Sequence, residues 1–158
     1  MDAEPDRVFL LVVGVVRRDE DVLMVLQAET EGSPYWTLPG GRVEPNEPLV
    51  EALAREVAEE TGVRIADQKL LYVKQVLTPD PDPNMLVFVF TCEPASPDVS
   101  VAPQDPDGLI LEAAFLPLAE AISHQETVFG PDEPTVAHLS GAAIESVWTF
   151  DHLPRIWR

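Results

Sequence analysis

The stretch GRVEPNEPLVEALAREVAEETGV, residues 41–63, decides how this chain folds. From Glu47 onward the stretch is rich in good helix formers, which predicts a helix over residues 47–61. Asn46, just ahead of it, is a residue type that caps a first helical turn. Gly62 stands where helices commonly end, because glycine accepts the left-handed backbone conformation of that position.

Three glutamates share one stripe of this predicted helix. Glu56, Glu59 and Glu60 have the spacing i, i+3, i+4, which places them within about 100° of one another on a helical wheel. An apolar arc adjoins the stripe and is expected to face the core; it is formed by Val50, Leu53 and Val57. The carboxylates therefore border the buried side of the helix.

Carboxylates held close to a core are costly unless their charge is neutralised. A hard divalent cation such as Mg²⁺ does this well, because it takes oxygen ligands and retains places for substrate phosphates and water. Arg55, beside Glu56, can orient a carboxylate through its planar guanidinium. The alternative reading is a solvated acidic helix face with Arg–Glu pairs and no ligand.

The wider pattern is G-x5-E-x7-R-E-U-x-E-E-x-G-U, where U is aliphatic, and it resembles the Nudix box. Every fixed position is filled, by Gly41, Glu47, Arg55, Glu56, Val57, Glu59, Glu60, Gly62 and Val63. The box covers 23 residues, and the order of predicted strands extends the resemblance over residues 7–125. The segment beyond, residues 126–158, resembles no family that we can name.

This resemblance implies an α/β (α+β) Nudix fold, in which a mixed β-sheet is sandwiched between helices. It implies a Mg²⁺ or Mn²⁺ site whose ligands are Glu56, Glu59, Glu60 and the Gly40 carbonyl. By the same analogy, Arg55 and Glu47 orient that site.

Members of the family often use a further carboxylate outside the box as general base or additional ligand. The candidates here are Asp105, Asp107 and Glu112, and Glu112 is the preferred one. Many relatives have a glutamate where this chain has Leu109, so Glu59 or Glu60 is an alternative base. Candidates for contact with the substrate lie just before the box and at its first residue: Tyr35, Trp36 and Gly41.

Outside the box the hydrophobic pattern alternates between strands and loops. Strands are predicted over residues 8–16, 22–26, 35–38, 70–76, 85–92 and 109–116, and helices over residues 118–123 and 135–147. We see no linker or internal repeat, and 158 residues suit one domain, so a single domain over residues 1–158 is expected.

The bulk composition limits the function. With 28 acidic and 10 basic residues the formal charge is −18, which disfavours nucleic acid and anionic membranes as partners. Cys92 is the only cysteine, so a disulfide framework is excluded. The acidic residues near the start do not suit a signal peptide, and a cytoplasmic location is expected. Aromatic residues near the end, among them Trp148, Phe150 and Trp157, could build a dimer interface, and a homodimer is expected.

The function implied is metal-dependent hydrolysis of a diphosphate linkage in a small nucleotide derivative, with ADP-ribose-like compounds as the first choice. One alternative is a pyrophosphohydrolase that removes oxidised purine nucleoside triphosphates. A non-enzymatic alternative is a regulator of the same fold that senses a nucleotide without cleaving it. A substrate panel with analysis of the products separates the three.

Overall fold

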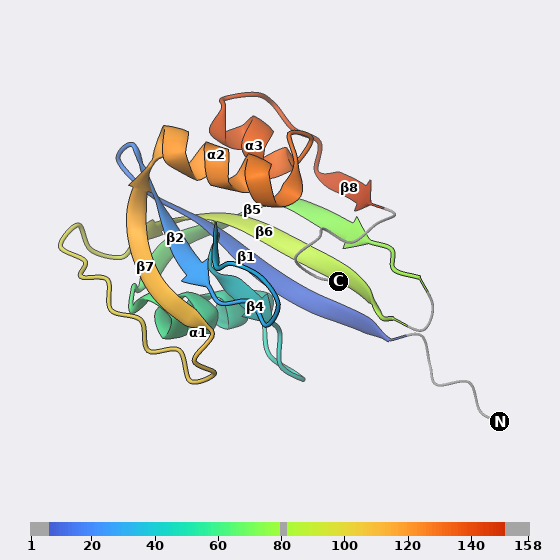
Figure 1. The fold of residues 1–158 in the computed structure, drawn as a ribbon, viewed down its shortest axis with the longest axis horizontal. Helices are drawn as coiled ribbons and strands as arrows, with labels where there is room; N and C mark the ends of the chain where they lie inside the picture. Colours follow the sequence, from blue (N-terminus) through green and yellow to red (C-terminus); the bar gives the residue numbers. More distant parts are fainter. Residues whose placement is uncertain (1–6, 80–81, 151–158) are drawn as a thin grey trace.

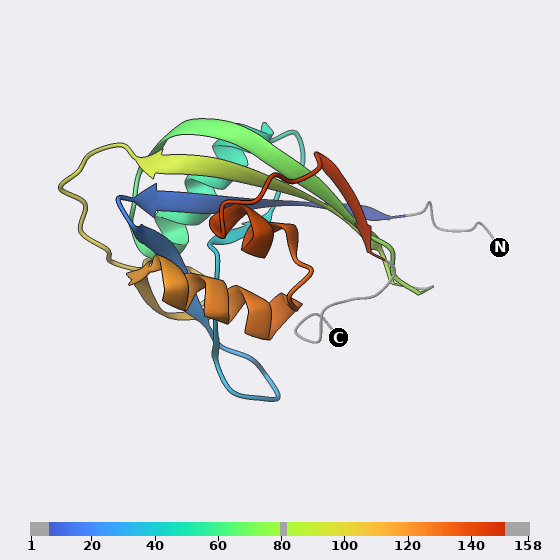
Figure 2. The same ribbon diagram turned by 90° about the horizontal axis from the view of Figure 1, so that it is seen from above.

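The computed structural model describes residues 7–79 and 82–150. Its strands are β1 Val8–Arg18, β2 Asp21–Gln27, β3 Tyr35–Thr37, β4 Gly40–Arg42, β5 Ile65–Val76, β6 Asn84–Pro94, β7 Ile110–Pro117 and β8 Val147–Phe150. Its helices are α1 Leu49–Thr61, α2 Leu118–Phe129 and α3 Pro134–Leu139. Helix α1 covers one side of the sheet, and α2 with α3 covers the other (Figures 1 and 2). The predicted fold class, a mixed sheet between helices, is confirmed.

The sheet divides beside its central strand. Its order is β3-β2-β1-β6-β5-β8, with β4 also paired to β1 and β7 to β2. Strands β1 and β6 run parallel from Val8↔Asn84 to Val16↔Cys92. Strands β1 and β2, by contrast, pair only at Arg17↔Val22 and Arg18↔Asp21. They separate beyond the hairpin, and the link from β3 to β4 crosses between the two parts of the sheet.

Side chains of β1 alternate between the two faces of the sheet and so contribute to both hydrophobic cores. Val12 and Val16 are fully buried against Leu53 and Val57 of α1. Val15, one position out of phase, belongs to the core under α2 and α3. Truncating a side chain such as Leu53 to alanine typically costs about 2–5 kcal/mol, so α1 is firmly seated on β1.

A buried ion pair crosses the second core. Lys74 of β5 and Glu133, just ahead of α3, are both 4% exposed, and their contacts are 3.0 and 3.1 Å. The Tyr72 hydroxyl lies 2.8 Å from Glu133 Oε1, to which it donates, and 2.7 Å from the Thr135 hydroxyl. This network joins the segment between α2 and α3 to the middle of the sheet.

The start of α1 differs from the sequence prediction. The helix begins at Leu49 and not at residue 47, with Pro48 at its N-cap and no side-chain cap. Asn46 adopts a left-handed conformation, with φ 61°, so its predicted capping role was wrong. Proline disfavours the helical conformation in the residue before it, which keeps Glu47 outside the helix. The prediction that Val50 faces the core was also wrong, because this residue is 47% exposed.

The C-terminal part also differs. The helix predicted over residues 118–123 continues to Phe129, whereas the one predicted over residues 135–147 ends at Leu139. The chain turns at Gly141, which has a φ of 86° and follows the end of α3. Strand β8 then begins at Val147 and pairs with β5. Trp148 packs against the second core, while Trp157 lies outside the described residues. None of the helices in the described ranges has the length and apolar character that a bilayer span requires.

Candidate active site

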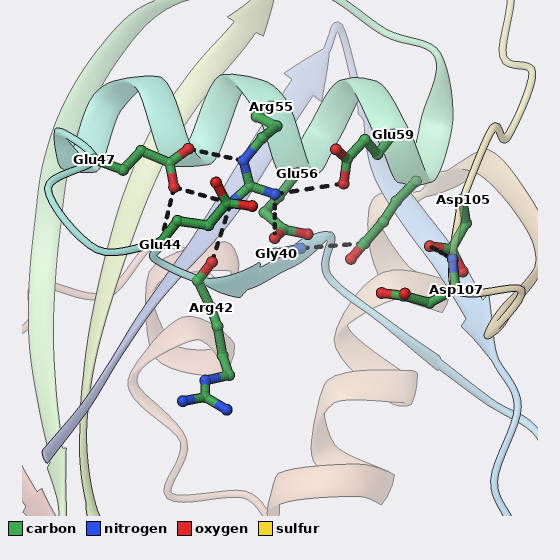
Figure 3. A network of polar contacts seen from close by, with 10 residues as sticks. Gly40, Arg42, Glu44, Glu47, Arg55, Glu56, Glu59, Asp105 and Asp107 are labelled. Atoms are coloured by element: carbon green, nitrogen blue, oxygen red, sulfur yellow. Dashed lines mark hydrogen bonds and ion pairs between the residues drawn. The ribbon is translucent and has the colours of Figure 1, made fainter. Parts of the chain in front are cut away.

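Two glycines bring β4 close to both β1 and α1. Gly40 and Gly41 pair with Val13 and Val12 of β1. A Cβ on Gly40 would overlap the Val12 carbonyl oxygen, and one on Gly41 would lie 2.5 Å from Cδ of Glu56. The absence of both side chains therefore lets the Glu56 carboxylate lie directly against β4 (Figure 3).

Arg55 is the centre of a network of carboxylates (Figure 3). Its Nε and Nη2 donate to the two oxygens of Glu47 at 2.7 and 3.0 Å, a bidentate contact. Its Nη1 donates to Glu56 at 2.8 Å and lies 3.4 Å from a Glu59 oxygen. Its Nη2 also donates to the Arg42 carbonyl at 3.1 Å. Arg55 therefore contacts three of the box glutamates, and its role in orienting them stays a prediction.

The two ends of the Arg55–Glu47 contact stabilise each other's charged forms. Hydrogen bonding to Arg55, and then to the Glu44 backbone N–H, holds the pKa of Glu47 below its ordinary value. Hydrogen bonding to Glu47 in turn raises the pKa of Arg55 above its ordinary value. Glu47 thus anchors Arg55 from outside the helix, which leaves Nη1 directed at Glu56 and Glu59.

Glu60 is the most deeply placed of the box glutamates. It is 9% exposed, and its carboxylate accepts a hydrogen bond from Gly40 N at 3.3 Å. Burial raises the pKa of Glu60 to about 9, and the nearby charges of Glu56, Asp105 and Glu59 act in the same direction. Burial also raises the pKa of Glu56, although Arg55 opposes the change.

We call Glu47, Glu56, Glu59 and Glu60 the carboxylate cluster. Three of its carboxylates, those of Glu47, Glu56 and Glu59, contact the single Arg55 guanidinium, so negative charge is in excess. Within the described residues, no three Asp, Glu, His or Cys side chains converge into a ready-made ion cage. Glu56 and Glu59 are directed toward Arg55.

The donors nevertheless fit a hard cation. They are oxygens, and the absence of a side chain at Gly41 leaves room for the Glu56 carboxylate, which a Cβ would displace. Magnesium ordinarily takes only one or two protein carboxylates, and substrate phosphates and water complete its shell. A full protein cage is therefore not required for binding.

The loop before β7 brings another acidic group to the cluster. The backbone N–H groups of Ala102 and Gln104 donate to carbonyls of Thr61 and Glu59, which fastens the loop to the end of α1. Asp105 faces the cluster, with Asp107 beside it (Figure 3). The Asp105 carboxylate accepts backbone N–H groups at 3.3, 2.6 and 3.0 Å, from residues 107, 109 and 110.

The remaining predicted site residues lie apart from the cluster. Glu112 is on β7, paired with Leu26, exposed, and not among the charges that act on Glu60. Trp36 is partly buried, with its ring centroid 6.2 Å from that of His124 on α2. Tyr35 is half-buried, and burial, followed by the charge of Glu29, raises its pKa. The structure thus brings together the box residues, Gly40, Gly41 and Asp105.

Known proteins share this sequence pattern. The chain is 32% identical over 109 residues to human 8-oxo-dGDP phosphatase NUDT18, a match covering 69% of this chain and 32% of that protein. It is 36% identical over 83 residues to phosphatase NudJ of Escherichia coli K12, covering 52% of this chain and 54% of that protein. The matches thus span about a third and about half of the length of these curated relatives.

Solved structures share the fold. A NUDIX hydrolase from Nitrosomonas europaea superposes with a TM-score of 0.72 at 21% identity, over 94% of this chain and 82% of that one. A MutT NUDIX hydrolase from Burkholderia pseudomallei gives a TM-score of 0.61 at 22% identity, over 72% of this chain and 85% of that one. The model of the NUDIX domain family matches residues 8–139. With its complete box seated on this fold, the chain belongs to the NUDIX domain family.

Proposed function

We propose that this chain hydrolyses a diphosphate linkage in a small nucleotide derivative, with Mg²⁺ or Mn²⁺ as cofactor. The observation that carries the proposal is the carboxylate cluster, in which the Arg55 guanidinium contacts three carboxylates and a fourth, that of Glu60, is buried. An acidic chain with charge −18 repels a diphosphate, and a bound cation overcomes this repulsion. An excess of carboxylates at one point of the surface suits that task.

In this proposal Glu56, Glu59, Glu60 and the Gly40 carbonyl hold the cation. Arg55 and Glu47 position those carboxylates and take no part in bond breaking. When bound, a divalent cation polarises a phosphoryl group and lowers the pKa of water. Gly41 keeps the space over β4 open, so that the Glu56 carboxylate reaches the site.

The general base is proposed to lie within the carboxylate cluster. Glu112, the choice made from the sequence, is not among the groups acting on Glu60. Asp105 faces the cluster, but its oxygens already accept three backbone N–H groups, so we assign it to positioning the loop. Glu59, whose side chain is 35% exposed, then remains as the proton acceptor, because burial raises the pKa of Glu60 and so favours its protonated form.

The substrate is proposed to be a nucleoside diphosphate or a diphosphate-linked derivative. The name of the human relative, an 8-oxo-dGDP phosphatase, favours an oxidised guanine nucleotide among these. An ADP-ribose-like substrate, the first choice from the sequence, stays a prediction. Nucleic acid and membranes are not proposed as partners, given the charge of −18. A homodimer and a cytoplasmic location remain predictions.

A substrate panel tests the proposal. ADP-ribose, 8-oxo-dGDP and 8-oxo-dGTP are incubated with the protein and Mg²⁺ or Mn²⁺ at slightly alkaline pH, and the products are separated by chromatography. Release of AMP with ribose phosphate, of inorganic phosphate from the diphosphate, or of pyrophosphate identifies the bond cleaved.

Glu59→Gln and Glu60→Gln are the matched controls for the site. We expect at least one of them to lose about a hundredfold or more in turnover, as on removal of a key catalytic group. Near-wild-type rates in both would refute the site. Tight binding of a nucleotide by the wild-type protein with no turnover of any compound would instead identify a sensor.

A further inference from the structure

Part of one face of the sheet lies beyond the start of α1. Strands β1, β5 and β6 extend well past this helix, and β8 lies beside β5 (Figures 1 and 2). The core beneath α1 includes Val12 and Val16 of β1 and Cys92 of β6. The opposite ends of these two strands, residues 8–10 and 84–86, are not part of that core. On the α1 side they therefore lack the cover that the helix gives to the rest of the sheet.

Burial alternates along this part of the sheet. On β5, Tyr72, Lys74 and Val76 are nearly inaccessible on the side of α2 and α3. The residues between and after them face the α1 side, because successive side chains of a strand point to opposite faces. With their neighbours on β1, β6 and β8 they form an apolar patch that we call the open face: Val8, Leu10, Val73, Leu77, Leu86 and Val147. The exposed fractions of Val8, Leu10, Leu77 and Val147 lie between 38% and 64%.

The open face carries no charged side chain within the described part of the sheet. The positions that complete it are Gln75, Asn84 and Thr149, which are polar but neutral. The net charge of −18 therefore lies on other surfaces of the molecule. A charged partner of either sign would find no counter-charge here.

The size of the open face follows from strand geometry. Strands lie about 4.8 Å apart and rise about 3.3 Å per residue, so four strands of five residues cover roughly 300 Å². Exposed apolar patches of a few hundred Å² often take part in binding. A standard interface buries about 800 Å² on each partner, so contact through the open face alone is expected to be weak and reversible.

A second copy of this chain suits the open face. The charge of −18 makes most approaches between two copies repulsive, and the repulsion is least where neither surface carries charge. A two-fold axis places the open face of one copy on that of the other, so apolar side chains meet apolar side chains. Gln75, Asn84 and Thr149 each supply both a donor and an acceptor, so they can pair with the same groups of the second copy.

We propose that the open face is the contact surface of a weak homodimer in which two sheets pack face to face. It is distinct from the surface formed by Trp148, which packs against the core on the α2 and α3 side. The inference does not depend on the proposed function, because it uses no residue of the carboxylate cluster.

Sedimentation velocity of the whole chain tests the inference. Protein from about 5 to about 500 µM is compared in about 0.05 M and about 0.5 M NaCl, conditions in which screening of exposed charges differs strongly. We expect a monomer–dimer equilibrium with a Kd on the order of 100 µM at high salt. At low salt the Kd should be at least about threefold higher, because the repulsion between two acidic copies is less screened.

Variants locate the contact. Val147→Lys and Leu10→Lys each place a charge on the open face, and the Kd should rise at least about tenfold. Leu111→Lys is the matched control, because Leu111 is 56% exposed on β7, which pairs with β2 in the other part of the sheet. It changes the net charge by the same amount and should leave the Kd within about twofold. All three positions are exposed, so the midpoint of thermal unfolding should shift by no more than about 2 °C.

A wild-type protein that stays monomeric up to about 500 µM at both salt concentrations would overturn the inference. That result would follow if another part of the chain or a different protein covered the open face. A dimer that survives Val147→Lys and Leu10→Lys unchanged would also overturn it, because the copies would then meet elsewhere. Neither result bears on diphosphate hydrolysis, and absence of turnover would leave the dimer contact standing.

Discussion

The two sides of the sheet carry charge in opposite ways. On the α1 side, one guanidinium contacts three carboxylates, whose side chains are 13%, 15% and 35% exposed. On the α2 and α3 side, one lysine faces one carboxylate, and both are nearly inaccessible. The first arrangement has surplus charge next to solvent, and the second is balanced and closed.

This difference separates two uses of ionisable groups. A balanced buried pair contributes by being complete, and removal of one member leaves an uncompensated charge in a low-dielectric core. A surplus of like charge destabilises the fold unless a ligand neutralises it, which is why such clusters are candidates for function. Changes to the ionisable groups of the α1 side should therefore appear in activity, and changes to those of the α2 and α3 side in stability.

The largest effect on stability is expected from Lys74→Met. Glu133 would remain buried without the two hydrogen bonds that Lys74 donates to it, and the free energy of unfolding should fall by about 3–5 kcal/mol. Urea unfolding followed by circular dichroism measures this change. The double variant Lys74→Met, Glu133→Leu should recover more than half of the stability. A Lys74→Met variant as stable as the wild type would contradict the view that the buried pair stabilises the fold by being complete.

Adjacent glycines offer the next test. In Gly40→Ala the new Cβ overlaps backbone of Val12, which cannot move freely, so stability should fall by about 1–3 kcal/mol. In Gly41→Ala it meets only the flexible end of Glu56, so stability should change little while kcat/KM falls about tenfold or more. Paired unfolding and activity measurements check both. Equal stability losses in the two variants would argue against the distinction between a backbone clash at Gly40 and a side-chain clash at Gly41.

A smaller effect is expected from Arg55→Lys. Lysine keeps the charge but lacks the fork that contacts Glu47 with two nitrogens, so the carboxylates lose orientation and kcat/KM should fall about tenfold. Arg42→Lys is the matched control, because Arg42 contacts Arg55 only through its backbone carbonyl. Full activity in Arg55→Lys would show that charge alone suffices.

The smallest effect concerns Cys92, which lies in the α1-side core at 4% exposure. Burial raises the pKa of its thiol to about 12, so the folded protein should remain unreactive toward a thiol reagent at pH 8. The stability that comes from keeping this thiol neutral is complete below the unfolded pKa and is lost as the pH rises toward 12. Stoichiometric labelling should appear only in urea. Rapid labelling of the native protein would indicate that this core opens.

The sequence predicted much of the fold because its signals were local. The box helix follows from residue types and spacing within residues 41–63, and β1 and β6 follow from β-branched runs. The predicted helix boundaries were wrong where a nearby proline or glycine set the backbone conformation. Pro48 removed Asn46 from the helix cap, and the turn at Gly141 ended the helix predicted over residues 135–147.

The site was predictable only in part for the same reason. Arg55 and the box glutamates are close in sequence, so their contacts follow from helix geometry. Asp105 was one of three acidic candidates in the segment before Phe115, and the choice among them depends on how the loop is fastened to α1. Lys74 and Glu133 are 59 residues apart, and a lysine at a buried position of β5 was the only available signal.

The parallel pairing of β1 with β6 has a consequence for how the chain acquires its chemistry. The central strand receives this neighbour only after residues 84–92 have been synthesised, well past the end of the box. A helix of 13 residues is marginal on its own in water. A fragment ending at Gly62 would contain every glutamate of the motif yet lack the support that aligns them. The motif alone is therefore not expected to form the site. The site forms only when strands distant in sequence, β1 and β6, have paired.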